Sequence, residues 1–307
     1  MKVIGLEISR SGFKAVEIDL KGKYPKVLSF SLGEFKEEGS KGLLIKEALR
    51  ERGFSSRVVN IAFSEASFIH RLIDLPPLTK KELSVVLPRE VNYEMSSLIE
   101  GDFDYAYQLV EGGAMVVAAP RSVIRDCLEV MREAGLRCSV LTTVPSALVN
   151  LLRLKGKYLI GPTLFVHISR QVCHLSIGEG ERLMFATSLP LQGDEADLER
   201  SLSRAARATL LFKERYGREV GYVMISGEPE RLTSCAAGLG DGLRIAVEIF
   251  DHKGALDTTP LREEMSAFQG LVPSLAVPIG LALKKPKDFQ LNLLSPGISY
   301  PLFELGR

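Results

Sequence analysis

The sequence has few of the residues from which metal centres and disulfide frameworks are built. Its 307 residues include four cysteines and four histidines, and neither set shows the close pairing that is typical of a metal site. Scattered cysteines of this kind favour thiols in a reducing compartment over disulfides. We therefore expect no bound metal.

An excess of charge of either sign is also absent. Lysine and arginine together number 39 and aspartate and glutamate 38, which leaves a net charge of +1. Binding to the phosphate backbone of a nucleic acid depends on an excess of basic side chains. The composition gives no reason to expect a nucleic acid partner, and the chain is long enough for two compact lobes.

Long apolar runs and the common catalytic loops are missing as well. The longest apolar run, residues 271–283, contains two prolines and falls short of the ~20 residues that a membrane-spanning helix needs. The N-terminus lacks the basic and then apolar pattern of a signal peptide. The sequence contains no Walker-type loop and no Gly-x-Ser-x-Gly motif. These absences predict a cytoplasmic protein.

A repeated hairpin pattern is the main positive feature of the sequence. Residues 3–18 form two short apolar stretches joined by a turn that carries Ser9, Arg10 and Ser11. Residues 164–177 repeat the pattern, with the same Ile-Ser-Arg sequence at the turn. Each hairpin opens one half of the chain, so the sequence predicts two halves of like topology.

The paired hairpins resemble those that open the two lobes of actin-like ATPases. In that family each turn is usually Asp-x-Gly followed by Ser or Thr, and the two turns hold the nucleotide phosphates between them. The first hairpin is most similar to that of PilM, a protein of type IV pilus machines, and to that of the cytoplasmic part of GspL, a type II secretion protein. The resemblance implies an α/β, actin-like (ribonuclease H-like) fold of two lobes, with a small inserted α/β subdomain in the first.

The resemblance also implies domain boundaries. The first lobe covers residues 1–160, with the inserted subdomain at about 64–137. The second lobe covers residues 161–283 and has a reduced outer subdomain, because the segment that follows Gly193 is short beside the usual insertion of the family. Its last predicted helix, 271–283, is expected to pack back on the first lobe, and residues 284–307 form a tail.

The inserted subdomain carries the segment most similar to PilM. The run Leu-Pro-Pro-Leu at 75–78, a capping-box signature at 79–82 and the later Asp104-Tyr105 pair follow the PilM pattern. Pro88 departs from it and is expected to kink or end the helix that begins at residue 80. In PilM an extended peptide of the partner lies in this region, so the resemblance implies a partner groove. Its candidate lining residues are Leu75, Leu83, Leu87, Tyr105 and Tyr107, with the core of the subdomain as the alternative role for the same side chains.

The nucleotide-binding positions of the family are altered in this chain. Glu7 and His167 stand where ATP-binding members have aspartate, and Ser9 and Ser169 stand where they have glycine. A Cβ at the turn blocks the approach of backbone amides to phosphate, and histidine cannot replace a carboxylate that holds Mg²⁺. We therefore expect a degenerate nucleotide site, a protein that is not an enzyme, and no bound cofactor.

The same cleft has two alternative interpretations. Arg10, Arg170 and Lys14 can hold phosphate by charge alone, which gives binding of ATP and Mg²⁺ without turnover. A working ATPase or a sugar-kinase-like phosphotransferase is the other alternative. The predicted cleft residues are Glu7, Ser9, Arg10, Ser11, Lys14, His167, Ser169, Arg170, Arg207 and Gly227. Arg207 is included because residues 207–212 resemble the Arg-Ser-Leu helix of PilM, although the stripe that it forms with Arg200 and Arg204 is also typical of a solvated helix face.

The tail contains the last motif. Leu291, Asn292, Leu293 and Leu294 resemble the Ile-Asn-Leu-Leu-Pro peptide by which PilN engages PilM, and the Asn-Leu segment that leads GspL to its membrane helix. Three leucines are too apolar to leave in water, so we expect this segment to be docked on the first lobe or the inserted subdomain, of its own or a neighbouring chain. The native chain is expected either to end at Arg307 or to continue into a membrane segment.

The resemblance as a whole implies a cytoplasmic scaffold, peripheral to the inner membrane, in a type IV pilus or type II secretion platform. Its expected partners are an inner-membrane platform protein of the PilN, GspM or GspF kind and an assembly ATPase of the PilB or GspE kind. Membrane association would come through the partner or through a C-terminal extension. The sequence leaves the choice between pilus and secretion system open.

Overall fold

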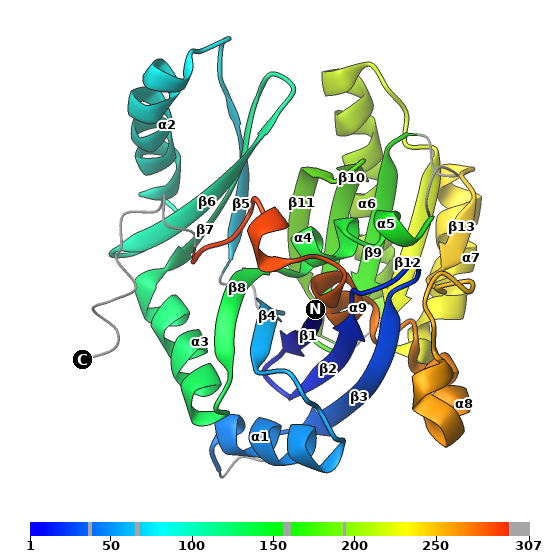
Figure 1. Ribbon diagram of the computed structural model, residues 1–307. Coiled ribbons are helices and arrows are strands. Elements are labelled where there is room, and N and C mark those ends of the chain that lie inside the picture. Colours follow the sequence, from blue (N-terminus) through cyan, green and yellow to red (C-terminus); the bar gives the residue numbers. More distant parts are fainter. Residues whose placement is uncertain (36–38, 65–67, 156–160, 193–194, 295–307) are drawn as a thin grey trace.

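The computed structural model describes residues 1–35, 39–64, 68–155, 161–192 and 195–294. The chain forms two lobes side by side, and a small subdomain extends from the first of them (Figure 1). The predicted α/β actin-like fold of two lobes with an inserted subdomain is confirmed.

Each lobe is built on a five-stranded sheet of the same topology. In the first lobe the strand order is β3-β2-β1-β4-β8, and in the second it is β11-β10-β9-β12-β13. In both sheets three antiparallel strands are followed by two parallel ones. The first sheet comprises β1 (Lys2–Ile8), β2 (Gly12–Asp19), β3 (Lys26–Glu34), β4 (Val58–Phe63) and β8 (Arg137–Thr143). The second comprises β9 (Thr163–Ile168), β10 (Val172–Glu179), β11 (Arg182–Pro190), β12 (Tyr222–Gly227) and β13 (Val247–Ile249).

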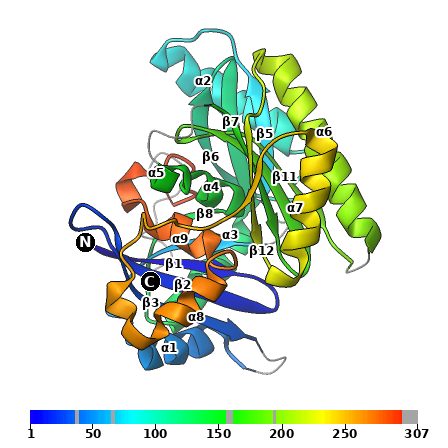
Figure 2. The same ribbon diagram turned by 90° about the vertical axis from the view of Figure 1, so that its right-hand side faces the viewer.

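The helices that flank the two sheets are held by caps and by their apolar faces. The helix α1 (Lys41–Glu51) begins at Ser40, whose side chain accepts a hydrogen bond from the amide of Leu43 at 3.1 Å. Its neighbour α3 (Arg121–Glu133) buries Ile124, Cys127 and Met131 on one face. The second lobe carries α6 (Glu195–Tyr216) and α7 (Pro229–Leu243) on its outside (Figure 2). All four cysteines are thiols, and three of them are buried.

The inserted subdomain is a three-stranded sheet covered by one helix. Its strand order is β5-β7-β6, made of β5 (Ile69–Asp74), β7 (Gly113–Pro120) and β6 (Phe103–Val110). The helix α2 (Lys80–Met95) starts with a capping box between Thr79 and Glu82. Of the two effects predicted for Pro88, an end of the helix does not occur, because α2 continues to Met95. The burial of Leu87, Val91 and Met95 against the sheet offsets the hydrogen bond that proline removes.

Two central helices lie between the lobes. They are α4 (Val144–Val149), which is followed by α5 (Leu152–Lys155), and α9 (Ala276–Ala282). The expected single helix over 271–283 is wrong: α8 (Met265–Leu271) follows a 3₁₀ segment, Thr259–Glu264, and a turn that contains Pro273 separates it from α9. The side-chain amide of Asn60 donates hydrogen bonds to the carbonyls of Leu281 at 2.9 Å and Lys284 at 3.1 Å, which fixes the end of α9 to the first sheet.

No single helix in the described part of the chain is long and apolar enough to cross a bilayer. By length and composition, only the bent pair Thr259–Leu271 and Ala276–Ala282 passes that criterion.

Candidate functional site

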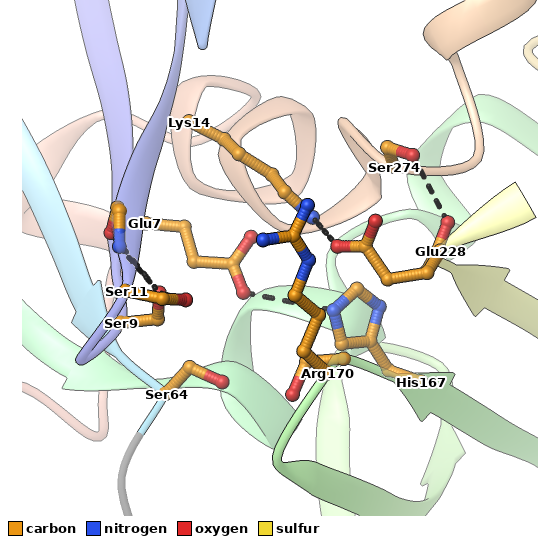
Figure 3. Close-up of polar contacts among 12 residues, drawn as sticks. Glu7, Ser9, Ser11, Lys14, Ser64, His167, Arg170, Glu228 and Ser274 are labelled. Carbon is orange, nitrogen blue, oxygen red and sulfur yellow. Dashed lines mark hydrogen bonds and ion pairs between the residues drawn. The ribbon is translucent and has the colours of Figure 1, made fainter. Parts of the chain in front are cut away.

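The two hairpin turns face each other across a cleft of about 290 Å³ between the lobes. The turn of β1 and β2 lies on one side, and the turn of β9 and β10 lies on the other. The two copies of the repeated hairpin sequence therefore place their turns on opposite sides of one cleft (Figure 3). The cleft is lined by Glu7, Ser9, Ser11, Gly12, Phe13, Lys14, Leu32, Gly33, Glu34, Ser64, Ser169, Arg170, Gln171 and Glu228.

The serines at the turns bond to their own hairpins. The amide and hydroxyl of Ser9 donate to the carbonyl of Gly12 at 2.8 Å and 3.1 Å, and the amide of Gly12 donates back to the hydroxyl at 3.1 Å. Ser169 repeats this arrangement with Val172, at 3.0 Å, 2.9 Å and 3.0 Å. A phosphate-binding turn needs backbone amides that point at the ligand. Here the amides of Ser9 and Gly12 are already satisfied within the turn.

Two of the three cations expected to bind phosphate, Lys14 and Arg170, are paired with carboxylates of the opposite lobe. The ammonium of Lys14, on β2, lies 2.9 Å from Glu228, which follows β12. The guanidinium of Arg170 lies 2.8 Å from Glu34 at the end of β3. The first pair is mostly shielded from solvent and the second is exposed, so most of the electrostatic stabilisation comes from Lys14 and Glu228. Both pairs link the lobes across the mouth of the cleft.

A buried pair closes the bottom of the cleft. Atom Nε2 of His167 lies 3.6 Å from Oε1 of Glu7, and both side chains are almost completely buried. Burial alone raises the pKa of the Glu7 carboxyl, but the Lys14 ammonium and His167 outweigh this effect and hold that pKa below 4.5. On its other side the His167 ring lies 2.9 Å from the hydroxyl of Ser226. His167 therefore joins the two lobes through its contact with Glu7.

A second histidine supports this contact. The ring nitrogens of His174 lie 3.1 Å from the hydroxyl of Ser64 in the first lobe and 2.8 Å from that of Ser188 in the second. Burial lowers the pKa of His174 to about 3, so the ring is neutral and exchanges hydrogen bonds with both hydroxyls at physiological pH. The cleft thus has three carboxylates, at Glu7, Glu34 and Glu228, against two cations. Among the described residues there is no group of three metal-ligating side chains.

The remaining residues predicted for the cleft divide between three places. Ser11 lines it, and Arg10 is exposed on the same turn without lining the cavity. Gly227 has a φ of 121°, and a Cβ there would lie 1.9 Å from the carbonyl oxygen of Ile168, so the position requires glycine. Arg207 is not in the cleft, because α6 carries it to a separate groove beside β5 and β11. The assignment of Arg207 to the nucleotide site is therefore wrong.

The sequence did not identify the role of several cleft residues. Glu34, Ser64 and His174 each contact the opposite lobe, and no local pattern marks them for it. Glu228, which follows β12, likewise contacts Lys14 of the first lobe. The residues that pair across the cleft are more than a hundred positions apart in the chain. Their pairing depends on how the two lobes lie relative to each other, which no short motif encodes.

The five candidates for a partner groove do not line one surface. Leu87 is 2% exposed and belongs to the core of the inserted subdomain, so its assignment to a groove is wrong. Leu75, Leu83 and Tyr105 are half-buried against the same core, whereas Tyr107 is 40% exposed. The alternative interpretation, a core role, fits four of the five. Tyr107 is the most exposed of the five.

The tail motif lies along β8, the outer strand of the first sheet (Figure 1). The amide of Leu293 donates to the carbonyl of Leu141 at 2.9 Å. The side chain of Asn292 accepts from the amide of Leu141 at 3.1 Å and donates to the carbonyl of Ser139 at 3.3 Å. Leu291 and Leu293 are buried, and Leu294 is half-buried. The segment is thus attached to the edge of its own first lobe by backbone and side-chain hydrogen bonds.

Replacing Leu293 by aspartate should release this segment. A buried leucine contributes about 1.5–3 kcal/mol, and a carboxylate at the same place would have no partner. We expect hydrogen exchange at the amide of residue 293 to accelerate strongly, whereas the matched variant Gln290→Asp, at an exposed position, should leave it protected. Equal exchange in the wild type and in Leu293→Asp would contradict the docked arrangement.

Comparison with known proteins supports the fold. No family model matches the sequence, and no curated protein matches it. The structure is similar to a chain of the PilM–PilN type IV pilus biogenesis complex, with a TM-score of 0.74 and 24% identity over 92% of this chain and 97% of that chain. It is also similar to the cytoplasmic domain of EpsL, an inner-membrane component of the type II secretion system of Vibrio cholerae, with a TM-score of 0.55 and 12% identity over 96% of this chain and 98% of that one.

A third similarity is to a Bacteroides thetaiotaomicron protein with an actin-like ATPase fold and unknown function. The TM-score is 0.50 and the identity 13%, over 86% of this chain and 95% of that chain. The two hairpins, the paired sheets and the cleft between them occur together in this architecture. The chain has the actin-like ATPase fold, and its structural neighbours include the PilM–PilN complex and the cytoplasmic domain of EpsL.

Proposed function

We propose that this protein is a non-catalytic scaffold on the cytoplasmic side of the inner membrane, in a platform for type IV pilus assembly or type II secretion. In this role it binds the cytoplasmic segment of a membrane protein of the PilN, GspM or GspF kind and couples it to an assembly ATPase of the PilB or GspE kind. Similarity to a chain of the PilM–PilN complex and to EpsL supports the setting.

The observation that carries the non-catalytic role is the ion-paired cleft. Lys14 and Arg170 each contact a carboxylate of the opposite lobe, and His167 contacts Glu7 at the base. A triphosphate would have to displace Glu228 from Lys14 and would face two further carboxylates. The cleft is therefore suited to holding the lobes in one arrangement, which a scaffold requires and a nucleotide-driven cycle does not.

We expect Mg-ATP to leave the melting temperature of the full chain unchanged to within about 1 °C. A nucleotide at a hundred times its Kd would add about 2.7 kcal/mol to the free energy of unfolding and be obvious in this assay. Lys14→Gln serves as the control variant, because it removes the cation nearest the cleft. A rise of several degrees that Lys14→Gln abolishes, together with release of phosphate, would overturn the scaffold proposal in favour of an ATPase or phosphotransferase.

Partner binding tests the scaffold role separately. The probe is a peptide that covers the cytoplasmic N-terminal segment of a PilN-like protein, titrated into the full chain by calorimetry. We expect saturable binding that Mg-ATP does not alter. Absence of binding by such segments would remove the proposed role even if the cleft proves empty.

A further inference from the structure

A second hollow lies between the inserted subdomain and the second lobe. It has a volume of about 360 Å³, and its lining residues belong to β5 and β7 of the subdomain and to β11 and α6 of the second lobe. We call it the arginine groove. It is lined by His70, Arg71, Leu72, Met115, Phe185, Ala186, Thr187, Arg204, Arg207, Ala208 and Leu211. None of these residues lines the nucleotide-type cleft.

The charge of the arginine groove has one sign. Arg71, Arg204 and Arg207 line it, and no aspartate or glutamate does. This is unusual in a chain whose acidic and basic residues are nearly equal in number. In the described part of the chain none of the three guanidinium groups forms an ion pair, and Arg71 donates only to the carbonyl of His70 at 3.3 Å. The groove therefore presents uncompensated positive charge.

Other arginines near the end of α6 do form ion pairs. Arg215, near the end of the helix, pairs with Asp74 of the inserted subdomain. Arg218, just beyond it, contacts Glu111 at 2.7 Å and Glu179 at 3.1 Å. Those two side chains join the second lobe to the subdomain. Arg204 and Arg207 lie earlier on α6 and have no ion-pair partner among the described residues, so their guanidinium groups can pair with a ligand.

Apolar side chains line the arginine groove beside the arginines. Arg204, Arg207, Ala208 and Leu211 recur at helical spacing, so one face of α6 supplies charge and apolar surface together. Leu211 is 46% exposed, an unusual state for a leucine beside an apolar floor. Met115, at 2% exposure, closes the bottom. A ligand that fills this groove must combine apolar groups with negative charge.

The backbone beside the groove offers a third means of recognition. β11 is the outermost strand of the second sheet, and Phe185, Ala186 and Thr187 of this strand line the groove. An outer strand carries N–H and C=O groups with no neighbouring strand to bond them. At the start of β11 the side chain of Gln108 on β6 accepts a hydrogen bond from the amide of Leu183 at 2.9 Å, so the part of this edge that faces the groove lies further along the strand, at residues 185–187. An extended peptide can pair with such an edge, and its side chains then alternate between the two sides.

We propose that the arginine groove binds an extended acidic segment of a partner protein, with carboxylates alternating with aliphatic side chains, as an added strand beside β11. The carboxylates pair with Arg204, Arg207 and Arg71, and the aliphatic side chains cover Leu211 and the apolar floor. A flat membrane surface does not fit, because Met115 is recessed between the lobe and the subdomain. The proposal does not depend on the proposed function of the cleft.

Fluorescence anisotropy with the full chain tests this inference. The probe is a fluorescein-labelled peptide of alternating glutamate and leucine, compared with the same peptide in which lysine replaces glutamate, at about 150 mM salt. We expect saturable binding of the glutamate peptide only. The variant Arg204→Glu/Arg207→Glu should weaken it by about tenfold or more, since two charge-assisted contacts become repulsive.

A matched control has the same change in net charge outside the groove. Arg125 on α3 and Lys213 on α6 are both exposed and do not line the arginine groove, so Arg125→Glu/Lys213→Glu should bind within about twofold of the wild type. The single variant Arg207→Gln provides a milder test in case the double reversal disturbs folding, and it should weaken binding by several-fold. Hydrogen exchange at residues 185–187 should slow when the glutamate peptide is present.

Four results would overturn the proposal. The first is absence of binding of the glutamate peptide to the wild type. The second is equal weakening in the control variant, which would indicate general charge attraction, and the third is unchanged exchange at residues 185–187. The fourth is binding of phosphatidylglycerol vesicles that Arg204→Glu/Arg207→Glu abolishes while peptide binding persists, which would assign the arginines to a lipid surface.

Discussion

Replacing Gly5 by alanine is expected to lower the free energy of unfolding by about 3 kcal/mol, at the upper end of the cost of overpacking a core. Gly5 lies in the middle of β1, where α9 crosses the first sheet. A Cβ at this position would lie 1.9 Å from the carbonyl oxygen of Pro278 and 2.9 Å from the amide nitrogen of Ala282. Both atoms belong to the backbone of α9, so no side chain can move aside to make room.

The matched control for Gly5 is Gly270→Ala. Gly270 lies in α8, its φ is not positive, and nothing lies within 4 Å of the position that a Cβ would take. Alanine should be neutral there or stabilise the helix by up to about 1 kcal/mol. Urea unfolding of both variants gives the comparison. Equal stability of Gly5→Ala and the wild type would mean that α9 does not rest directly on β1.

The contact at Gly5 also explains how the lobes are joined. Gly280 on the opposite side of α9 approaches α4 in the same way, because a Cβ there would lie 2.1 Å from the carbonyl oxygen of Ala147. The side chain of Asn150 donates to the carbonyl of Gly280 at 3.1 Å. Two glycines thus allow α9 to pack closely on the first sheet and on α4 at once. The cleft lies beside this rigid junction.

The overall fold could be predicted from the sequence because its signals are local and repeated. Each hairpin has apolar strands and a short polar turn within fewer than twenty residues, and the two copies are related by the same Ile-Ser-Arg sequence. The capping box at Thr79 and Glu82 marked the start of α2 to the residue. Such signals depend only on residues that are close together in the sequence. They can therefore be recognised without knowledge of the tertiary structure.

The errors arose where tertiary packing decides the outcome. Pro88 is unfavourable inside a helix, but the buried face of α2 outweighs its local cost. Residues 271–283 form a largely apolar run, yet the turn at Pro273 separates α8 from α9, so the run does not form one helix. Arg207 matched a family pattern in sequence, but the placement of α6 carries its side chain to the arginine groove.

The sequence predicted most of the individual residues of the candidate site but did not predict which of them contact each other. The altered residues Glu7, Ser9, His167 and Ser169 were identified from their positions in the hairpins, and all but His167 line the cleft. That His167 contacts Glu7, and that Lys14 contacts Glu228, follows only from the closed arrangement of the lobes. These two contacts connect the first lobe to the second.

Replacing His167 by alanine is expected to cost about 3–5 kcal/mol at pH 7, the usual effect of leaving a buried carboxylate, here that of Glu7, without one of its partners. The substitution leaves the Glu7 carboxylate buried, with one oxygen that already has no hydrogen-bond partner among the described residues. Urea unfolding at pH 7 measures the loss. The double variant His167→Ala/Glu7→Gln should recover part of it, because no charge then remains buried at the base of the cleft.

The pH dependence separates this electrostatic effect from a simple loss of volume. In the wild type the pKa of Glu7 is below 4.5, so its ionised form stabilises the fold above pH 4.5, and this contribution is lost as the pH falls through the lower pKa of the folded state. In His167→Ala the carboxyl loses a partner and takes up a proton at a higher pH. The stability difference between wild type and His167→Ala should therefore narrow as the pH falls from 7 towards 4. A constant difference across this range, or a double variant no more stable than the single one, would show that His167 acts by filling space and that the pair does not hold the lobes together by charge.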